Sequence, residues 1–132
     1  MPNATLWNSY YNAVDKIRVI IEKSSRDVVR DVFLALDVAT LKPDEILLLY
    51  EYCKVMQPLA CALDILQSET KCYMGILPPT FVSLKTKLAT FKLTLKYCAP
   101  LADALLQGVD TRFQGYMDRQ DLVLASLTMP QF

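Results

Sequence analysis

Apolar residues recur along most of this chain at steps of three and four residues, which is the period of an amphipathic helix. The first such stripe consists of Tyr10, Val14, Ile17 and Ile21. Thr5 precedes the stripe and is suited to cap the start of a helix. Ser24-Ser25 interrupt the pattern, and a shorter amphipathic segment follows over residues 28–36. The pattern therefore predicts two helices, the second of which ends near Asp37.

The next segment is apolar around most of its circumference. Lys42-Pro43-Asp44-Glu45 predicts a helix start, because proline fits the first turn and acidic residues there complement the helix dipole. The segment from Ile46 to about Ser68 is apolar on so many sides that we expect a long central helix with neighbours on more than one face. Pro58 lies inside this helix. Since proline removes a backbone hydrogen bond and clashes with the preceding turn, we expect a kink or a break there.

Two further segments have less regular patterns. Residues 70–79 contain Pro78-Pro79 and predict a connecting loop, followed by a proline-led helix from Thr80. Residues 91–97 alternate like a strand but also fit a helical stripe. We expect a helix there, because one isolated strand in a helical chain would have no partner.

The last part of the chain predicts two more helices. Pro100 is suited to open the first, and Asp118 is suited to cap a short final helix that runs through Leu127. The chain of 132 residues is long enough to bury a hydrophobic core. The overall prediction is one all-α domain over residues 1–132, a compact bundle of six or seven helices with one long central helix.

The charge and the apolar content of the chain narrow its possible partners. Fourteen basic and fourteen acidic residues cancel, so net charge does not steer the chain toward nucleic acid or an anionic membrane. Glu51, Lys54 and Asp64 interrupt the longest apolar run, which is therefore shorter than the roughly eighteen uninterrupted residues typical of a membrane span. An apolar fraction of 53% is high for a soluble domain. It indicates that some apolar surface faces a protein partner, a second copy or the rest of a longer chain.

Residues that commonly carry catalysis are scarce. The chain has no histidine, so its serines and cysteines lack the base of a usual nucleophilic triad. Three pairs of acids have the spacing of a magnesium site or an acid–base pair: Asp44 with Glu45, Asp27 with Asp31, and Asp118 with Asp121. Caps, dipole partners and solvated helix faces explain these pairs more simply. We therefore expect no enzyme activity, no cofactor and no small-molecule substrate.

The four cysteines do not have the spacing of a metal site. Cys53, Cys61, Cys72 and Cys98 form no C-x-x-C pair, and no histidine is available to complete a zinc site. Cysteines within apolar helical stretches are usually reduced core residues of intracellular proteins. We expect no bound metal.

Lysines predominate in the middle of the chain. No acidic residue lies between Glu69 and Asp103. On one helix, Lys85, Lys92 and Lys96 would form a single stripe, since steps of seven and four residues return to nearly the same face. Such a stripe could contact DNA phosphates, although lysines on a solvated face with their stems over apolar neighbours are the simpler interpretation.

Three stretches together carry a resemblance to a known family. Thr5-Leu6-Trp7-Asn8-Ser9 opens the first helix, Pro58-Leu59 lies in the long helix before the loop and the proline-led helix, and Thr128-Met129-Pro130-Gln131-Phe132 ends the chain. In this order and spacing they resemble the T-R-W-N-S start, the proline-bearing helix and the L-D-P-R-F ending of the hAT superfamily of DNA transposases. Host proteins domesticated from these transposases share the same features.

The resemblance implies that the chain is a fragment of a longer protein. It would cover the helical region inserted into the RNase H-like core, with the catalytic acids outside residues 1–132. In active members the tryptophan and the preceding arginine handle the flipped base and the DNA hairpin. Trp7 is kept, but Leu6 takes the place of that arginine, and Thr128 and Gln131 replace the aspartate and arginine of the ending. These replacements are typical of a domesticated scaffold rather than a working transposase.

Two functions from different classes remain open. The first is a non-catalytic protein-interaction or oligomerisation module, acting in the nucleus in transcription or chromatin regulation as the resemblance implies. The alternative is residual structure-selective DNA binding through Trp7, Lys85, Lys92 and Lys96, although a tryptophan on an apolar helical stripe is more often a core residue. An unrelated helical bundle would explain the chain if the three stretches matched by coincidence.

Overall fold

The computed structural model describes residues 6–68 and 73–128, and it gives the side chains from Asn8 onward. These residues form six α-helices and one short 3-10 helix, with no strand among them. The all-α prediction is therefore confirmed. The elements are α1 (Leu6–Lys23), α2 (Arg26–Ala35), α3 (Pro43–Leu66), η1 (Met74–Ile76), α4 (Leu77–Lys92), α5 (Ala99–Met117) and α6 (Gln120–Leu127).

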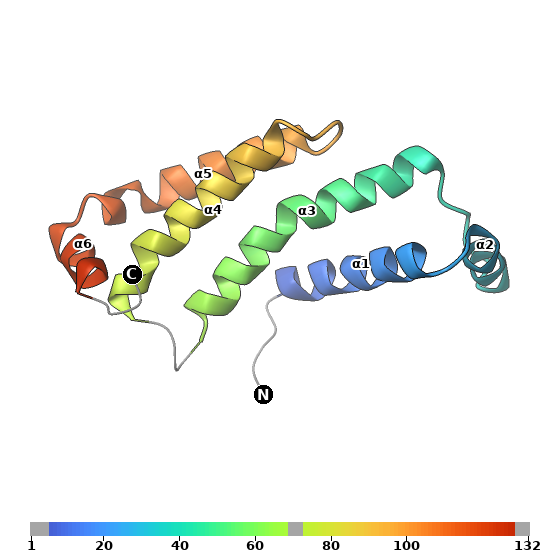
Figure 1. Cartoon of the computed structure of the whole chain (residues 1–132), viewed down its shortest axis with the longest axis horizontal. Coiled ribbons are helices and arrows are strands. Elements are labelled where there is room, and N and C mark those ends of the chain that lie inside the picture. Colours follow the sequence, from blue (N-terminus) through green and yellow to red (C-terminus); the bar gives the residue numbers. More distant parts are fainter. Residues whose placement is uncertain (1–5, 69–72, 129–132) are drawn as a thin grey trace.

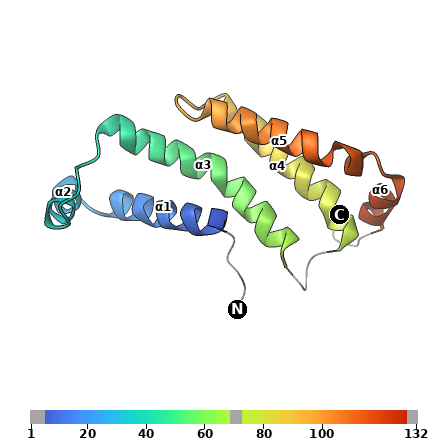
Figure 2. The ribbon, with the colours of Figure 1, turned by 180° about the vertical axis from the view of Figure 1, so that it is seen from behind.

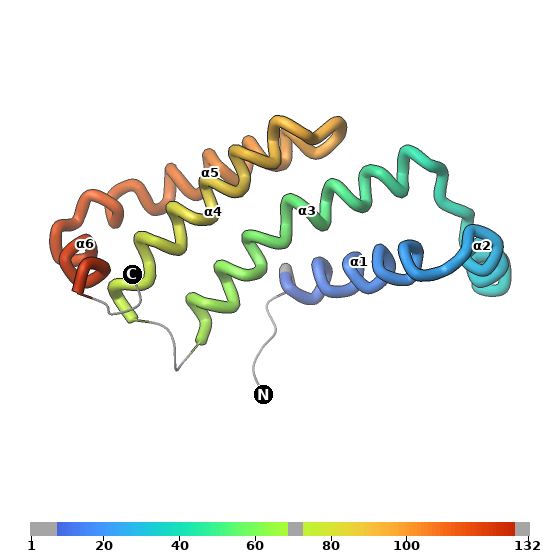
Figure 3. The backbone as a smooth tube through the Cα atoms, in the orientation of Figure 1, coloured from blue at the N-terminus to red at the C-terminus, as the bar shows by residue number. Residues whose placement is uncertain are grey.

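Four of the helices lie side by side in a row. The order across the row is α1, α3, α4 and α5, and each helix packs on the next (Figure 1). Viewed from behind, α3 again lies between α1 and α4 (Figure 2). The backbone tube shows α2 turned across one end of the row and α6 across the other, where α6 packs on η1 and α4 (Figure 3). The long helix α3 is therefore central, as predicted.

The hydrophobic core lies between α3, α4 and α5. Val55 of α3 and Leu88 of α4 are fully buried. The rings of Phe81 on α4 and Phe113 on α5 have centroids 4.2 Å apart and belong to the same core. In contrast, α2 contributes no buried residue. Packing is therefore dense on the α4–α5 side of α3 and sparse at the α2 end.

The predicted break at Pro58 does not occur. Helix α3 runs without interruption from Pro43 to Leu66, and a kink at Pro58 is not confirmed. Pro58 itself is buried, and the helix packs on both α1 and α4. Tertiary packing of this kind supplies most of the stability of a helix in a protein, so it offsets the loss of one hydrogen bond.

By length and composition alone, α3 would be able to cross a membrane. The same composition is typical of a core helix. In this fold α3 is covered by α1 on one side and α4 on the other. Its residue Glu51 is buried and hydrogen-bonded within the fold. These neighbours account for part of the apolar character of α3, while Leu47, Leu48 and Ile65 remain exposed.

Other boundaries differ from the predictions by a few residues. Helix α4 begins at Leu77 rather than Thr80, and Pro78-Pro79 lie in its first turn, where proline is tolerated. Asp118 is the C-cap of α5 and does not cap α6, whose N-cap is Arg119. Pro100 does lie in the first turn of α5, as predicted. The predicted cap Thr5 lies outside the described residues.

The largest error concerns residues 91–97, which were expected to be helical. Helix α4 ends at Lys92, and the chain then forms a loop before α5. The carboxylate of Glu51 accepts backbone N–H hydrogen bonds from Lys96 at 2.6 Å, Tyr97 at 2.7 Å and Cys98 at 2.9 Å. Since these three N–H groups bond to a side chain of α3, they do not continue a helix.

The environment of Glu51 fixes the charge state of its carboxyl group. Burial raises its pKa, but the N–H donors of Lys96, Cys98 and Tyr97 outweigh that effect, so the pKa is below its usual value. Only 6% of the residue is exposed to solvent. A carboxyl whose pKa is lower in the folded than in the unfolded state stabilises the fold at neutral pH. That stabilisation is lost as the pH falls through the folded-state pKa.

We expect Glu51→Gln to lower the free energy of unfolding by about 3 kcal/mol at pH 7, because the amide is uncharged and turns one donor toward the N–H groups. The difference from the unsubstituted chain should shrink as the pH falls from about 4.3, the usual pKa of an unfolded glutamate, through the lower folded-state pKa of Glu51. Urea unfolding followed by circular dichroism from pH 7 to pH 3 measures both effects.

The matched control is Glu22→Gln, which neutralises an exposed carboxylate on α1 that accepts a hydrogen bond from Arg18. Its effect should be below about 1 kcal/mol, as is usual for a surface ion pair. Equal losses in the two variants would contradict the role given to Glu51.

Candidate functional site

The lysines predicted to contact DNA lie in two different elements. Lys85 and Lys92 are on α4, but α4 ends at Lys92, so Lys96 belongs to the loop before α5. The predicted stripe of three lysines on one helix is therefore wrong. The loop forms because its N–H groups bond to Glu51. Within the loop, Lys96 Nζ lies 3.9 Å from Asp44 Oδ1 at the start of α3.

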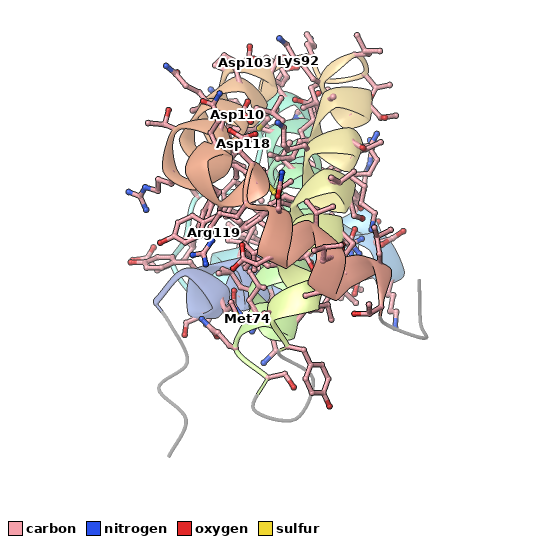
Figure 4. The ribbon with its side chains drawn as sticks, turned by 90° about the vertical axis from the view of Figure 1, so that its left-hand side faces the viewer. Met74, Lys92, Asp103, Asp110, Asp118 and Arg119 are labelled. Carbon is pink, nitrogen blue, oxygen red and sulfur yellow. The ribbon has the colours of Figure 1, made fainter. Side chains whose placement is uncertain are left out.

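Two of the three lysines of α4, Lys85 and Lys92, face aspartates of α5. Lys92 Nζ lies 2.5 Å from Asp103 Oδ1, and Lys85 pairs with Asp110. Figure 4 shows Lys92 beside Asp103 at the end of these helices, with Asp110 farther along α5. Lysines seven residues apart on one helix thus meet aspartates seven residues apart on its antiparallel neighbour. These contacts reduce the positive potential that a phosphate would meet along α4.

The fourth candidate for DNA contact, Trp7, lies in the first turn of α1. Its side chain lies outside the described residues. Helix α1 packs on one side of α3, and α4 packs on the other (Figure 1). The backbone position of Trp7 is therefore separated by α3 from those of Lys85 and Lys92 on α4.

Three of the acids in the predicted pairs have structural partners in the fold. Glu45 accepts the backbone N–H of Lys42 at 2.7 Å and so caps α3. Asp44 accepts the hydroxyl of Tyr97 at 2.9 Å. Asp121 accepts two hydrogen bonds from the Arg119 guanidinium, which hold the pKa of its carboxyl below the usual value. Within residues 6–68 and 73–128, no three histidine, cysteine or acidic residues are grouped to hold a metal.

A groove of about 430 Å³ lies between α1, α3 and the loop after α4. Its charged side chains are bound to neighbours. Arg18 lies 2.8 Å from Asp15 and from Glu22, and Lys54 Nζ lies 3.0 Å from Thr94 Oγ1. Burial raises the pKa of the thiol of Cys53, another residue that lines the groove, and this keeps the sulfur protonated and a poor nucleophile. The charged side chains of the groove therefore already have partners within the fold.

A second and very different surface lies where α1 and α2 meet. Five apolar side chains there are between 42% and 68% exposed. We call them the α1–α2 face: Ile17, Ile20, Val32, Leu36 and Val38. Together with Ile21 and Phe33 they line a hollow of about 310 Å³ whose lining side chains are all apolar. Contiguous exposed apolar surface of this kind is typical of a protein-interaction site.

The C-terminal end of α2 gives this face its shape. Asp37 has a φ of 54°, in the left-handed region, and the chain reverses there. The N–H of Asp37 donates to the carbonyl of Leu34 at 3.1 Å, and the N–H of Val38 donates to that of Phe33 at 2.9 Å. This is a Schellman motif, which normally brings the residue after the turn onto the last turn of the helix. Val38 thereby becomes part of the apolar face.

Sequence reasoning did not locate the α1–α2 face. It predicted an amphipathic second helix over residues 28–36 but not which of its apolar residues a neighbouring helix covers. In the structure Val29 and Phe33 are half-buried, whereas Val28 and Val32 remain exposed. The available signal was the width of the apolar arc, which also includes Leu36 and exceeds what one neighbouring helix can cover.

No protein-family model, curated protein or solved structure matches this chain. The resemblance to hAT transposases therefore rests on the sequence motifs alone.

We expect Asp37→Gly to raise the free energy of unfolding by about 0.5–1 kcal/mol, because glycine adopts a positive φ without the steric cost that aspartate pays. Asp31→Gly, in the interior of α2, should lower it by about the same amount, since glycine weakens a helix interior. Thermal unfolding of both variants measures the difference. A lower free energy of unfolding in Asp37→Gly would contradict the steric cost that we assign to the positive φ of Asp37.

We also expect weak DNA binding that does not depend on the lysine candidates, because each of the three lies beside an aspartate. Fluorescence anisotropy with duplex and hairpin DNA across a salt series, on the chain and on a triple alanine variant of Lys85, Lys92 and Lys96, checks this. Binding at physiological salt that weakens steeply as salt rises, and that the triple variant loses, would support the DNA-handling alternative instead.

Proposed function

We propose that this chain is a non-catalytic protein-interaction or oligomerisation module, and that the α1–α2 face is its binding surface. The observation that carries the proposal is the half-exposed apolar hollow between α1 and α2. Burial of exposed apolar side chains is the main driving force of protein association. The five residues of the face lie next to one another and would be covered together by one partner.

The chemistry of the remaining residues supports a role without catalysis. Buried Cys53 and Cys98 have thiol pKa values raised by burial, so they are poor nucleophiles. The carboxylate of Glu51 is fully engaged by backbone donors. A working acid, base or nucleophile needs an accessible group with a pKa suited to the reaction.

The setting of this module is proposed from the sequence motifs. The resemblance to hAT transposases supports a domesticated protein that acts in the nucleus in transcription or chromatin regulation. The replacement of the motif's arginine by Leu6 and of its terminal charges by Thr128 and Gln131 supports a scaffold role over DNA excision.

Site-specific photo-crosslinking tests the binding surface. We expect p-benzoylphenylalanine in place of Ile20, which is 57% exposed on the α1–α2 face, to give discrete protein adducts in cells. The matched control places the same group at Val82, which is 55% exposed on α4, away from the face. Adducts should form at position 20 and be absent at position 82, as gel mobility and mass spectrometry would record. Equal labelling at both positions, or none at either, would reject the proposal.

A further inference from the structure

We propose that the α1–α2 face is covered by a second copy of this chain, related by a twofold axis. This inference rests on the proposed interaction function and names the partner. In a twofold interface the same patch of each copy meets itself, so every part of the patch must be complementary to the part related to it by the axis. The charges that border the apolar face satisfy this requirement.

One border of the face is basic. Lys16 and Lys23 on α1 are four residues before and three residues after Ile20, so both lie next to it on the helix surface. Both side chains are exposed, and no ion pair joins either of them to another described residue. They therefore form an unpaired cationic edge beside the apolar hollow.

The border of the face on α2 carries two acids. Val28 lies one turn before Val32 of the face, and Asp31 is three residues after Val28, so Asp31 lies next to this exposed valine at the edge of the face. Asp27 lies one turn before Asp31, and the two carboxylates are 83% and 70% exposed. Arg30 pairs with both acids, at 3.8 Å from Asp27 and 3.7 Å from Asp31, but these distances exceed hydrogen-bond distance and all three side chains are exposed. Exposed ion pairs of this kind contribute little free energy, so lysines of a partner can replace Arg30 beside the two acids.

A twofold axis across the middle of the face brings the basic border of each copy against the acidic border of the other. Lys16 and Lys23 of one copy would then face Asp27 and Asp31 of the second at both edges, with the apolar hollows between them. A partner with borders of a single sign would meet like charge along one edge, which disfavours association. The chain also has no net charge, so its copies do not repel one another at long range.

The apolar centre can be tested first, by sedimentation equilibrium of the full chain over a concentration series. The unsubstituted chain should show a monomer–dimer equilibrium. Val32→Glu places a carboxylate in the buried centre and should weaken dimerisation roughly 30-fold. Val82→Glu, on α4, should leave it unchanged. Circular dichroism verifies that both variants keep their helices, so a loss of dimer is not a loss of fold.

Charge reversal tests the twofold arrangement itself. The double variant Lys16→Glu with Lys23→Glu has two acidic borders, and Asp27→Lys with Asp31→Lys has two basic borders. Each variant alone should dimerise roughly tenfold more weakly, whereas an equimolar mixture should form a 1:1 heterodimer, as native mass spectrometry would detect. The control Lys87→Glu with Arg112→Glu changes the net charge as much as the first variant, at exposed positions on α4 and α5, and should still dimerise.

A monomeric unsubstituted chain, a dimer that Val32→Glu does not weaken, or a mixture that does not associate would each overturn the self-association proposal. If in that case the crosslinks at position 20 contain a different protein, the interaction function stands and only the identity of the partner is wrong. If position 20 gives no specific adduct either, both proposals fail.

Discussion

A single buried carboxylate holds the second half of the fold against the first. Glu51 is on the central helix α3, and its three donors lie at the point where the chain turns from α4 into α5. Without this acceptor, the turn would bury backbone N–H groups that have no partner, which is costly in any fold. With the turn fixed, α5 runs back along α4 in the register that brings Asp103 and Asp110 to the lysines of α4.

The helical period predicted most of the elements because each depends mainly on residues within one or two turns. The errors occur where a distant group decides the backbone. Residues 91–97 fit a helical stripe, but Glu51, more than forty residues earlier, binds the N–H groups of Lys96, Tyr97 and Cys98. Pro58 would disrupt an isolated helix, yet α3 is held by α1 on one side and by α4 on the other. The sequence pattern within one or two turns does not indicate either contact.

The candidate site was harder to predict for the same reason. A run of lysines without nearby acids along the sequence suggested a basic surface, but their acidic partners come from other elements of the fold. The apolar face was hidden because the short helix α2 is apolar on two sides, and the sequence does not say which side a neighbour covers. Only the packed structure separates half-buried Val29 and Phe33 from exposed Val28 and Val32.

The row of helices also implies an uneven distribution of local stability. The fully buried residues Val55 and Leu88 join α3 to α4, whereas α2 has no buried residue and holds to the row through its contacts with α1. Segments with few buried contacts open by local unfolding at a lower free energy than the rest of a protein. Amide hydrogen exchange would therefore be faster in α2 than around Leu88. A partner bound to the α1–α2 face would slow exchange in α2. Binding at this face and the folding of α2 would then stabilise each other.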